Sequence, residues 1–473
     1  MSSAVQPYRG LLFLSAETTG ELKQQLIAVL ETARQGQTPP SRLPDSAERM
    51  KPQRLAIDYN SAAELVKQGE RALKAFESDT PAAWSAMTAH GIYRGSGSPG
   101  KVAFLFPGQG SQYVNMLRDM MESEPVVKAT FDEADRVMTP LLGRPLTSYI
   151  LCDEDEDGIK KAEAALRDTT ITQPAVLTTN SALLRLMEKF GFHPDYVIGH
   201  SLGEYAALVA AGVLTFGEAL EVVSARGREM SKVSMEDNGC MAAISAPIAD
   251  VEKVLAGIEG YVVLANINSP VQSVIGGTTT AVEEAIRVFQ STGIQAVKIP
   301  VSHAFHTKIV APASAPLRQV ISRMNVKPPR LPVVANVTGA FYPTGREQIL
   351  DMLAAQVASP VQFVKGIETI YHAGGRVFVE VGPKRVLNSL ATDILKDKND
   401  VVVLATNHPR KGAIPSFNEA LCGLLAAGVA SRQTDENARE VIVVAEKKTD
   451  IPSIHPMKEI FPPKPNGGMS QAA

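Results

Sequence analysis

The feature that most constrains the fold is a serine between two glycines where a strand turns into a helix. The apolar residues Tyr196–Ile198 predict a short buried strand, and Glu204–Val213 predict an apolar helix. Between them stands Gly199-His-Ser-Leu-Gly203, which matches the GxSxG pattern of a nucleophile elbow. The glycines let two backbones approach closely, and the helix N-terminus favours negative charge that develops near the serine. Ser201 is therefore a candidate nucleophile.

The segments around this motif alternate between strands and helices. Residues 101–106 predict a strand and 178–190 a helix, and apolar strands return at 331–337 and 376–382. This order predicts a parallel α/β core. Residues 234–301 follow a different rhythm, with short segments in the order strand-helix-strand-strand-helix-strand. That order is typical of a ferredoxin-like unit.

The N-terminal part reads as a separate small α/β unit with no evident chemistry. Strands are predicted from residue 10 and residue 54, and helices over 19–34 and 61–77. We therefore predict an α/β-hydrolase-like parallel-sheet core with an inserted ferredoxin-like subdomain, plus this small N-terminal domain. The predicted boundaries are 1–98 for the N-terminal domain, 99–232 and 302–397 for the core, 233–301 for the insertion, 398–430 for a C-terminal strand and helix, and 431–473 for a flexible tail.

Composition excludes several classes of protein. The formal net charge of -3 argues against general nucleic-acid binding. Cys152, Cys240 and Cys422 form no CxxC pair, so neither a disulfide framework nor a metal site is expected, which fits a reducing cytoplasm. The sequence contains no run of about 18 apolar residues, so we expect no membrane span. Its first residues show no signal-peptide pattern.

A serine hydroxyl needs a base, and the residues alone leave the choice of histidine open. His200 is adjacent in sequence, but we expect it to point away from Ser201 and to pack beside the site. His303 and His306 follow a predicted strand where the insertion returns to the core, a natural place to face a cleft. Sequence chemistry does not choose between these two.

A glycine-rich loop follows the strand at 101–106. Gly108-Gln-Gly110 leaves backbone N–H groups exposed, and the N–H of Gln109 could join that of Leu202 to hold an oxyanion. A phosphate-binding loop is the alternative, but the lysine of that motif is missing.

Taken together, these motifs resemble the malonyl-CoA:acyl carrier protein acyltransferase family, in the form found within type I polyketide and polyunsaturated fatty acid synthases. The resemblance runs from about residue 8 to about residue 430. It is carried by FPGQGSQ at 106–112, TQPA at 172–175, GHSLGEY at 199–205, RGREM at 226–230, NSP at 268–270, SHAFH at 302–306 and EVGP at 380–383.

The resemblance implies a reaction and its participants. A malonyl group would pass from malonyl-CoA to Ser201 and then to the phosphopantetheine thiol of an acyl carrier protein. We expect no permanently bound cofactor. The expected partners are the acyl carrier protein and the adjacent ketosynthase of the same synthase, and the expected location is cytoplasmic.

The resemblance also implies roles for individual residues. The histidine of the family motif matches His306, with the backbone carbonyl of Gln356 orienting it. Arg226 would grip the malonyl carboxylate, since its planar fork suits a carboxylate. The HAFH motif accompanies malonyl rather than methylmalonyl. Further residues expected to contact substrate are Phe305, His200, Gln173, Asn266 and Asn268.

Residues 1–98 resemble the ketosynthase-to-acyltransferase linker, and 398–430 the post-acyltransferase linker, so we expect a piece of a larger synthase. The competing classes are a serine thioesterase or acyl hydrolase with an editing role, and a non-catalytic docking module. Two features favour transfer. Arg226 anchors a charged acyl group, and a cleft walled by the insertion fits a long phosphopantetheine arm, whose thiol reaches the ester while water is largely excluded.

Overall fold

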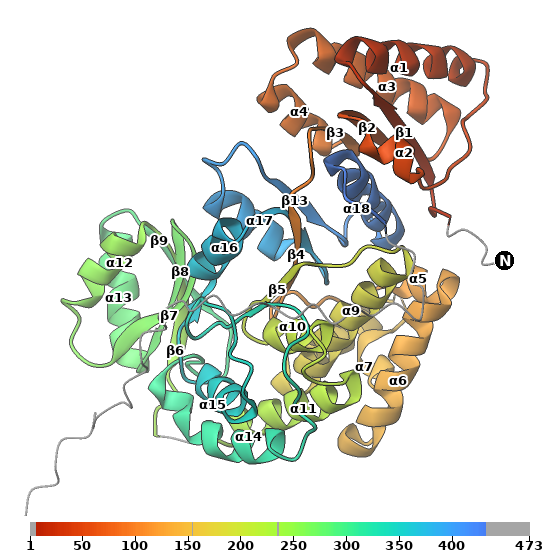
Figure 1. Cartoon of the computed structure of the whole chain (residues 1–473). Helices are drawn as coiled ribbons and strands as arrows, with labels where there is room; N and C mark the ends of the chain where they lie inside the picture. Colours follow the sequence, from red (N-terminus) through yellow and green to blue (C-terminus); the bar gives the residue numbers. More distant parts are fainter. Residues whose placement is uncertain (1–5, 154, 234–235, 432–473) are drawn as a thin grey trace, which may run out of the picture. The chain divides into compact units, whose positions relative to one another are not determined.

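A parallel five-stranded sheet lies at the centre of the computed structural model, which describes residues 6–153, 155–233 and 236–431 (Figure 1). All the neighbouring strands in this sheet pair in parallel. Phe106, the last residue of one strand, pairs with Gly199, the last residue of the next, so the loops after both strands meet at one edge. The strand order is β10 (Val333–Val334), β5 (Tyr196–Gly199), β4 (Lys101–Phe106), β12 (Gly375–Glu380) and β13 (Val402–Ala405).

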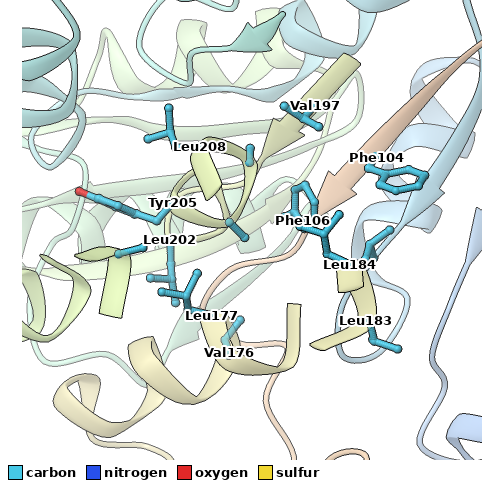
Figure 2. Packing of buried hydrophobic residues seen from close by; sticks show 14 of the residues in the cluster. Phe104, Phe106, Val176, Leu177, Leu183, Leu184, Val197, Leu202, Tyr205 and Leu208 are labelled. Carbon is cyan, nitrogen blue, oxygen red and sulfur yellow. The ribbon is translucent and has the colours of Figure 1, made fainter. Parts of the chain in front are cut away.

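Helices cover both faces of this sheet, because its strands carry apolar side chains on both faces. Phe104 and Phe106 belong to one core, which also contains Leu184 of α9 (Thr169–Lys189) and Leu208 of α10 (Gly203–Ala210), as Figure 2 shows. Ala103 and Leu105 belong to a second core, which packs against α16 (Phe363–His372) and α17 (Val386–Ile394). Outside the insertion, the other described helices between residues 107 and 360 are α5 (Arg118–Ser123), α6 (Pro125–Leu142), α7 (Thr147–Ile150), α8 (Glu156–Ala165), α11 (Phe216–Lys232), η1 (Lys308–Ala313), α14 (Ser314–Ile321) and α15 (Arg346–Gln356).

Two predicted elements of the core differ in length from the observed ones. The helix predicted from residue 178 begins at Thr169, where Asp168 caps it by accepting from the N–H of Thr170. Pro174 lies inside this helix, and a proline there disfavours a helical reading of the sequence. The strand predicted at 331–337 keeps only the two residues of β10, since the chain turns into polar contacts at Asn336.

The insertion forms a second sheet, with the order β11-β7-β8-β6-β9. Its four inserted strands lie in the spatial order of a ferredoxin-like fold and pair antiparallel. The edge strand β11 comes from the core instead and pairs in parallel with β7, with Val361 opposite Asn266. The elements are β6 (Cys240–Ser245), α12 (Ile248–Leu255), β7 (Val262–Ser269), β8 (Gln272–Gly277), α13 (Thr279–Ser291), β9 (Gln295–Ile299) and β11 (Val361–Gln362).

The N-terminal unit is a three-stranded antiparallel sheet with helices on one face, and a C-terminal helix, α18 (Ala413–Ala427), packs on the other. Asn418 of this helix donates to Asp58 over 2.6 Å, which ties the two segments together. The elements of the unit are β1 (Gly10–Ala16), α1 (Thr19–Arg34), α2 (Ser46–Met50), β2 (Gln53–Tyr59), α3 (Ala62–Ser78), α4 (Pro81–Thr88) and β3 (Ile92–Ser96).

The predicted flexible tail lies outside the described residues, apart from Ser431. In the part of the chain that the structure describes, no helix has the length and apolar character needed to cross a membrane.

Candidate active site

The serine of the GxSxG motif stands on a strained turn between β5 and α10. Ser201 has a φ of 52°, in the left-handed region that non-glycine residues rarely adopt. The flanking glycines are required by close backbone approach. A Cβ on Gly199 would lie 2.0 Å from the carbonyl carbon of Gly203, and one on Gly203 would lie 1.9 Å from the carbonyl oxygen of Phe106. The predicted elbow is therefore present, with the hydroxyl raised at the edge of the sheet.

His306 is the histidine in contact with this serine. Its Nε2 lies 2.7 Å from Ser201 Oγ. Its Nδ1 faces the backbone carbonyls of Gln356 and Ser359, at 3.1 and 3.2 Å. Because carbonyls only accept, Nδ1 carries the proton and Nε2 is left to accept from the serine hydroxyl. His303 is directed elsewhere, with Nε2 2.8 Å from the carbonyl oxygen of Val233.

The imidazole of His306 is held in its neutral form. Its pKa is lowered to about 3, mainly by burial and then by the nearby Arg226 and His200. A neutral ring with a free nitrogen toward the hydroxyl is the state that a general base needs.

Arg226 on α11 brings a buried positive charge to the same place. Its side chain is only 2% exposed, and its Nη2 lies 3.4 Å from Ser201 Oγ and 3.4 Å from Gln356 Oε1. Its Nε has no hydrogen-bond partner, and no carboxylate of the described residues forms an ion pair with it. A buried charge without a counter-ion is costly, so this guanidinium is suited to receive an anion.

These groups open into a cavity of 270 Å³ between the core and the insertion. Its floor holds Ser201, His306 and Arg226. Lining residues from the loop after β4, the insertion and α17 include Gly108, Gln109, Met241, Asn266, Val274 and Leu390. A long, narrow substrate arm would have protein on both sides in this position.

The other predicted substrate contacts are divided between the cavity wall and the layer behind it. His200 and Asn268 line the cavity and bond to each other over 2.8 Å, and Asn266 and Phe305 line it as well. Gln173 is fully buried and does not line the cavity. Its Nε2 lies 3.9 Å from Met230 Sδ, and it is Met230 that faces the cavity.

The glycine-rich loop after β4 packs on the elbow, as the predicted oxyanion site requires. A Cβ on Gly108 would lie 2.3 Å from the carbonyl oxygen of His200 and 3.3 Å from the backbone nitrogen of Leu202. Neither the N–H of Gln109 nor that of Leu202 donates to a partner among the described residues. Both stay available for a developing negative charge.

Sequence reasoning missed a buried polar network beneath the elbow. The side chain of Asn336 accepts from the Ser201 N–H over 2.6 Å and donates to the Gly199 carbonyl over 2.6 Å. The Gln356 amide donates to the Ser201 carbonyl over 2.7 Å. These bonds hold both backbone groups of the strained serine. The available signals were an asparagine after an apolar strand and a glutamate inside an apolar helix.

That glutamate, Glu204, is fully buried, and its desolvation raises the pKa to about 7. Its carboxyl group accepts from the Tyr342 hydroxyl, from the Gln356 amide over 2.8 Å and from the Asn336 N–H over 3.3 Å, and these bonds oppose the rise. In the described part of the chain, no group of three His, Cys, Asp or Glu side chains is placed to hold a metal ion.

Comparisons with known proteins agree with this architecture. The family described as "Acyl transferase domain" matches residues 103–428. The malonyl CoA-acyl carrier protein transacylase of Bacillus subtilis (strain 168) is 37% identical over 308 residues, covering 64% of this chain and 93% of that protein. The spectinabilin polyketide synthase system protein NorB of Streptomyces orinoci is 34% identical over 394 residues, covering 82% of this chain and 17% of that protein.

Among solved structures, the acyl transferase domain of SpnD, in complex with 2-(pent-4-yn-1-yl)malonyl, matches with a TM-score of 0.73 at 28% identity. The match covers 90% of this chain and 98% of that one. The predicted fold class is confirmed, since the parallel core and the ferredoxin-like insertion are both present. Because the family match spans more than half of the residues and includes Ser201, His306 and Arg226, the chain belongs to the acyltransferase family that also contains the acyl carrier protein transacylases and the acyltransferase domains of polyketide synthases.

Proposed function

We propose that this acyltransferase moves a malonyl group from malonyl-CoA to Ser201, and from there to the phosphopantetheine thiol of an acyl carrier protein. The observation that carries the proposal is the meeting of two features in one cavity. The first is a serine in contact with a neutral histidine, and the second is a buried arginine without a counter-ion, 3.4 Å from the serine oxygen. The transacylase name of the Bacillus subtilis relative supports the same reaction.

In the first half-reaction, Ser201 Oγ attacks the thioester carbonyl while its proton passes to His306 Nε2. The carbonyl oxygen becomes an oxyanion, which the N–H groups of Gln109 and Leu202 would bind. When the C–S bond breaks, His306 returns the proton to the sulfur and free coenzyme A departs. The product is a malonyl ester on Ser201.

The second half-reaction repeats these steps with a different thiol. The phosphopantetheine sulfur gives its proton to His306 and attacks the ester carbonyl. The C–O bond then breaks, and the proton returns to Ser201 Oγ. The enzyme is regenerated, and no oxidant, metal or cofactor takes part. Gln356 holds the imidazole through its backbone carbonyl, 3.1 Å from Nδ1, so the same tautomer serves both halves.

Arg226 supplies selectivity for an acyl group that carries its own carboxylate. Two parallel N–H···O bonds from a guanidinium to a carboxylate are short and strong, and they fix orientation as well as affinity. Phe305 supplies the second discrimination. Phe305 lines the cavity together with His306, and its ring would occupy the space that the extra methyl of methylmalonyl needs.

We further propose that the chain is part of a larger synthase, with 1–98 and 398–430 as the linkers on either side of the acyltransferase core and 233–301 as its insertion. The chain spans 17% of NorB, and the matched 394 residues exceed the family match at 103–428. An adjacent ketosynthase, a carrier protein and a cytoplasmic location belong to this proposal.

The test is intact-mass spectrometry after incubation with malonyl-CoA alone. We expect a stable malonyl adduct on the unmodified protein and none on Ser201→Ala. His306→Ala should slow loading by about 10²–10⁴-fold, because a general base is lost. His303→Ala is the matched control and should load at nearly the normal rate.

Two results would contradict the proposal. Free malonate released without an adduct would indicate a hydrolase or thioesterase instead. A larger defect in His303→Ala than in His306→Ala would remove the assigned base. Transfer to a phosphopantetheinylated carrier protein, followed by mass on that partner, completes the test.

A further inference from the structure

Glu204 and Arg226 are separated by a single side chain, the amide of Gln356. The amide Nε2 donates to Glu204 Oε2 over 2.8 Å and to the Ser201 carbonyl over 2.7 Å. The amide Oε1 accepts from Arg226 Nη2 over 3.4 Å. All three side chains are buried, with exposed fractions of 0%, 0% and 2% for Glu204, Gln356 and Arg226. Each lies on a different helix of the core, α10, α15 and α11.

The orientation of this amide is dictated by its neighbours. The Ser201 backbone carbonyl accepts hydrogen bonds and donates none, and the Glu204 carboxyl group does the same in its ionised form. They therefore require the NH₂ end of Gln356, and the opposite orientation would place its oxygen against two acceptors. With the NH₂ end committed to Glu204 and Ser201, the oxygen end is directed at Arg226.

The oxygen of Gln356 matters because Arg226 has few other anchors. Among the described residues, the Nε of Arg226 has no partner, and the other hydrogen bond of this side chain is the 3.4 Å contact to Ser201 Oγ. An acceptor at one edge of the guanidinium limits its rotation and leaves the rest of the fork for a ligand. A guanidinium that is already placed loses less freedom when a carboxylate binds.

We propose that Glu204 is a positioning residue for carboxylate recognition, which acts by fixing the Gln356 amide so that the amide oxygen holds the Arg226 guanidinium in its receiving position. The inference rests on the proposed function and adds a determinant of acyl selectivity that touches no substrate.

The two oxygens of Glu204 have different contacts, which makes the inference testable. Oε2 contacts Gln356, as the proposal requires. Oε1 accepts from the Tyr342 hydroxyl and from the Asn336 N–H, contacts that hold α10 to the chain after β10. A purely structural role would depend on the Oε1 contacts, whereas a selectivity role depends on Oε2.

The decisive variant is Glu204→Gln, which keeps the shape and replaces one acceptor by an NH₂ group. If the new carbonyl oxygen stays with Tyr342, the new NH₂ faces Gln356 and forces its amide to turn. The turned amide presents NH₂ groups to Arg226 and repels it. We expect kcat/KM for malonyl-CoA to fall roughly tenfold more than kcat/KM for acetyl-CoA, chiefly through KM, because a hydrogen bond to a charged group is lost.

Two matched variants separate selectivity from folding. Tyr342→Phe removes a contact at Oε1 only, so it should lower the Tm. It should leave the malonyl-to-acetyl ratio within about twofold of the unmodified protein, because Tyr342 lies outside the contacts that couple Glu204 to Arg226. Gln356→Met keeps the backbone carbonyl that faces His306 and removes the amide. It should reproduce the loss of malonyl preference even if Glu204→Gln does not fold.

The final arm places Glu204→Gln in an Arg226→Ala background. Because this background has no guanidinium to be positioned, Glu204→Gln should lower malonyl and acetyl transfer by the same factor. If, with Arg226 present, Glu204→Gln and Gln356→Met each lowered malonyl and acetyl transfer by the same factor, Glu204 would be only a structural residue. A change of ratio that persists without Arg226 would also overturn the inference. Failure of the proposed function looks different, because the unmodified protein would then form no malonyl ester, or Arg226→Ala would keep its preference.

Discussion

Two buried arginines, one in the N-terminal unit and one in the active site, show how the same side chain serves opposite purposes. Arg54 on β2 is 1% exposed and donates to four backbone carbonyls, from Lys51, Gly97, Ala426 and Ala427, over 2.7 to 3.4 Å. Two of these carbonyls belong to the last turn of α18, where the helix dipole presents its negative end. Arg54 is therefore satisfied by the fold itself.

Arg226 is buried to the same degree, but its N–H groups are not all satisfied by acceptors of the described residues. Within the part of the chain that the structure describes, it makes two hydrogen bonds, each 3.4 Å long, and its Nε has no partner. Burial lowers the pKa of both arginines, so desolvation acts on both. The difference lies in the acceptors. A satisfied buried cation holds two segments together, whereas an unsatisfied one beside a serine hydroxyl is suited to bind an anion.

The largest expected effect is at Arg226. Arg226→Ala should lower malonyl transfer by about 2–5 kcal/mol in transition-state stabilisation, because the carboxylate would be left unpaired in a partly dry cavity. Acetyl transfer should be kept or improved. Steady-state kinetics with the two coenzyme A esters measure both values. An unchanged malonyl-to-acetyl preference would show that Arg226 does not select the acyl group.

The complementary change at the satisfied arginine should affect stability alone. Arg54→Met keeps the aliphatic stem and leaves buried carbonyls at the end of α18 without a hydrogen-bond donor. We therefore expect a loss of about 2–4 kcal/mol in the free energy of unfolding. Denaturant unfolding gives this value, and the malonyl-to-acetyl ratio should not move. Arg34→Met is the matched control, because its ion pair with Glu70 is half exposed and should cost at most about 1 kcal/mol. A change of acyl preference in Arg54→Met would show that the two arginines are not separate in function.

A third change tests the apolar part of the cavity, which Arg226 does not control. Phe305→Ser should relax the preference for malonyl over methylmalonyl, because one methyl in a pocket decides about 1–3 kcal/mol, or roughly 10–200-fold. Competition between equal amounts of the two esters, resolved by the mass of the acyl-enzyme, gives the ratio. Predominant methylmalonyl loading by the unmodified protein would refute the malonyl assignment. An unchanged ratio in the variant would remove Phe305 as its cause.

The smallest expected effect is electrostatic and concerns His306. Its pKa is lowered to about 3 by burial first and then by Arg226 and His200. A lowered histidine pKa keeps the base neutral into acid, so protonation slows acylation only at low pH. Removing Arg226 removes one lowering cause and raises the pKa of His306.

The acid limb of acetyl loading should therefore begin at higher pH in Arg226→Ala than in the unmodified protein. Single-turnover loading from acetyl-CoA, from about pH 3, where the pKa of His306 lies, up to about pH 8, measures the limb in both proteins. A limb that moves to lower pH would contradict the sign. An unmoved limb would mean that Arg226 does not act on His306 at all.

Much of the architecture could be predicted because it is encoded in local patterns. The alternation of apolar strands and helices predicted the parallel core, and the order of short strands in 234–301 predicted the ferredoxin-like insertion. The elbow at Ser201 follows from glycine spacing alone, since only glycine tolerates contacts of about 2 Å at positions 199 and 203. Pro174 hid the start of α9 because local propensity is outweighed there by packing.

By itself, then, the sequence predicted a candidate nucleophile and determined the sheet that presents it and the insertion that faces it. It left the base open between His303 and His306, and the resemblance to a family chose His306. Only the tertiary structure showed which ring reaches Ser201 Oγ, because the two histidines are three positions apart and a turn in the backbone sends them in different directions.

The tertiary structure also decided what surrounds that pair. Glu204, Asn336 and Gln356 are distant in the chain and meet only when three segments pack beneath the elbow. Arg226 resembles an ordinary helix arginine in the sequence, and among the described residues it is the lack of acceptors around its buried guanidinium that distinguishes it from Arg54. Hydrogen bonding and desolvation depend on which groups are brought together and shielded from water, and no spacing along the chain specifies that.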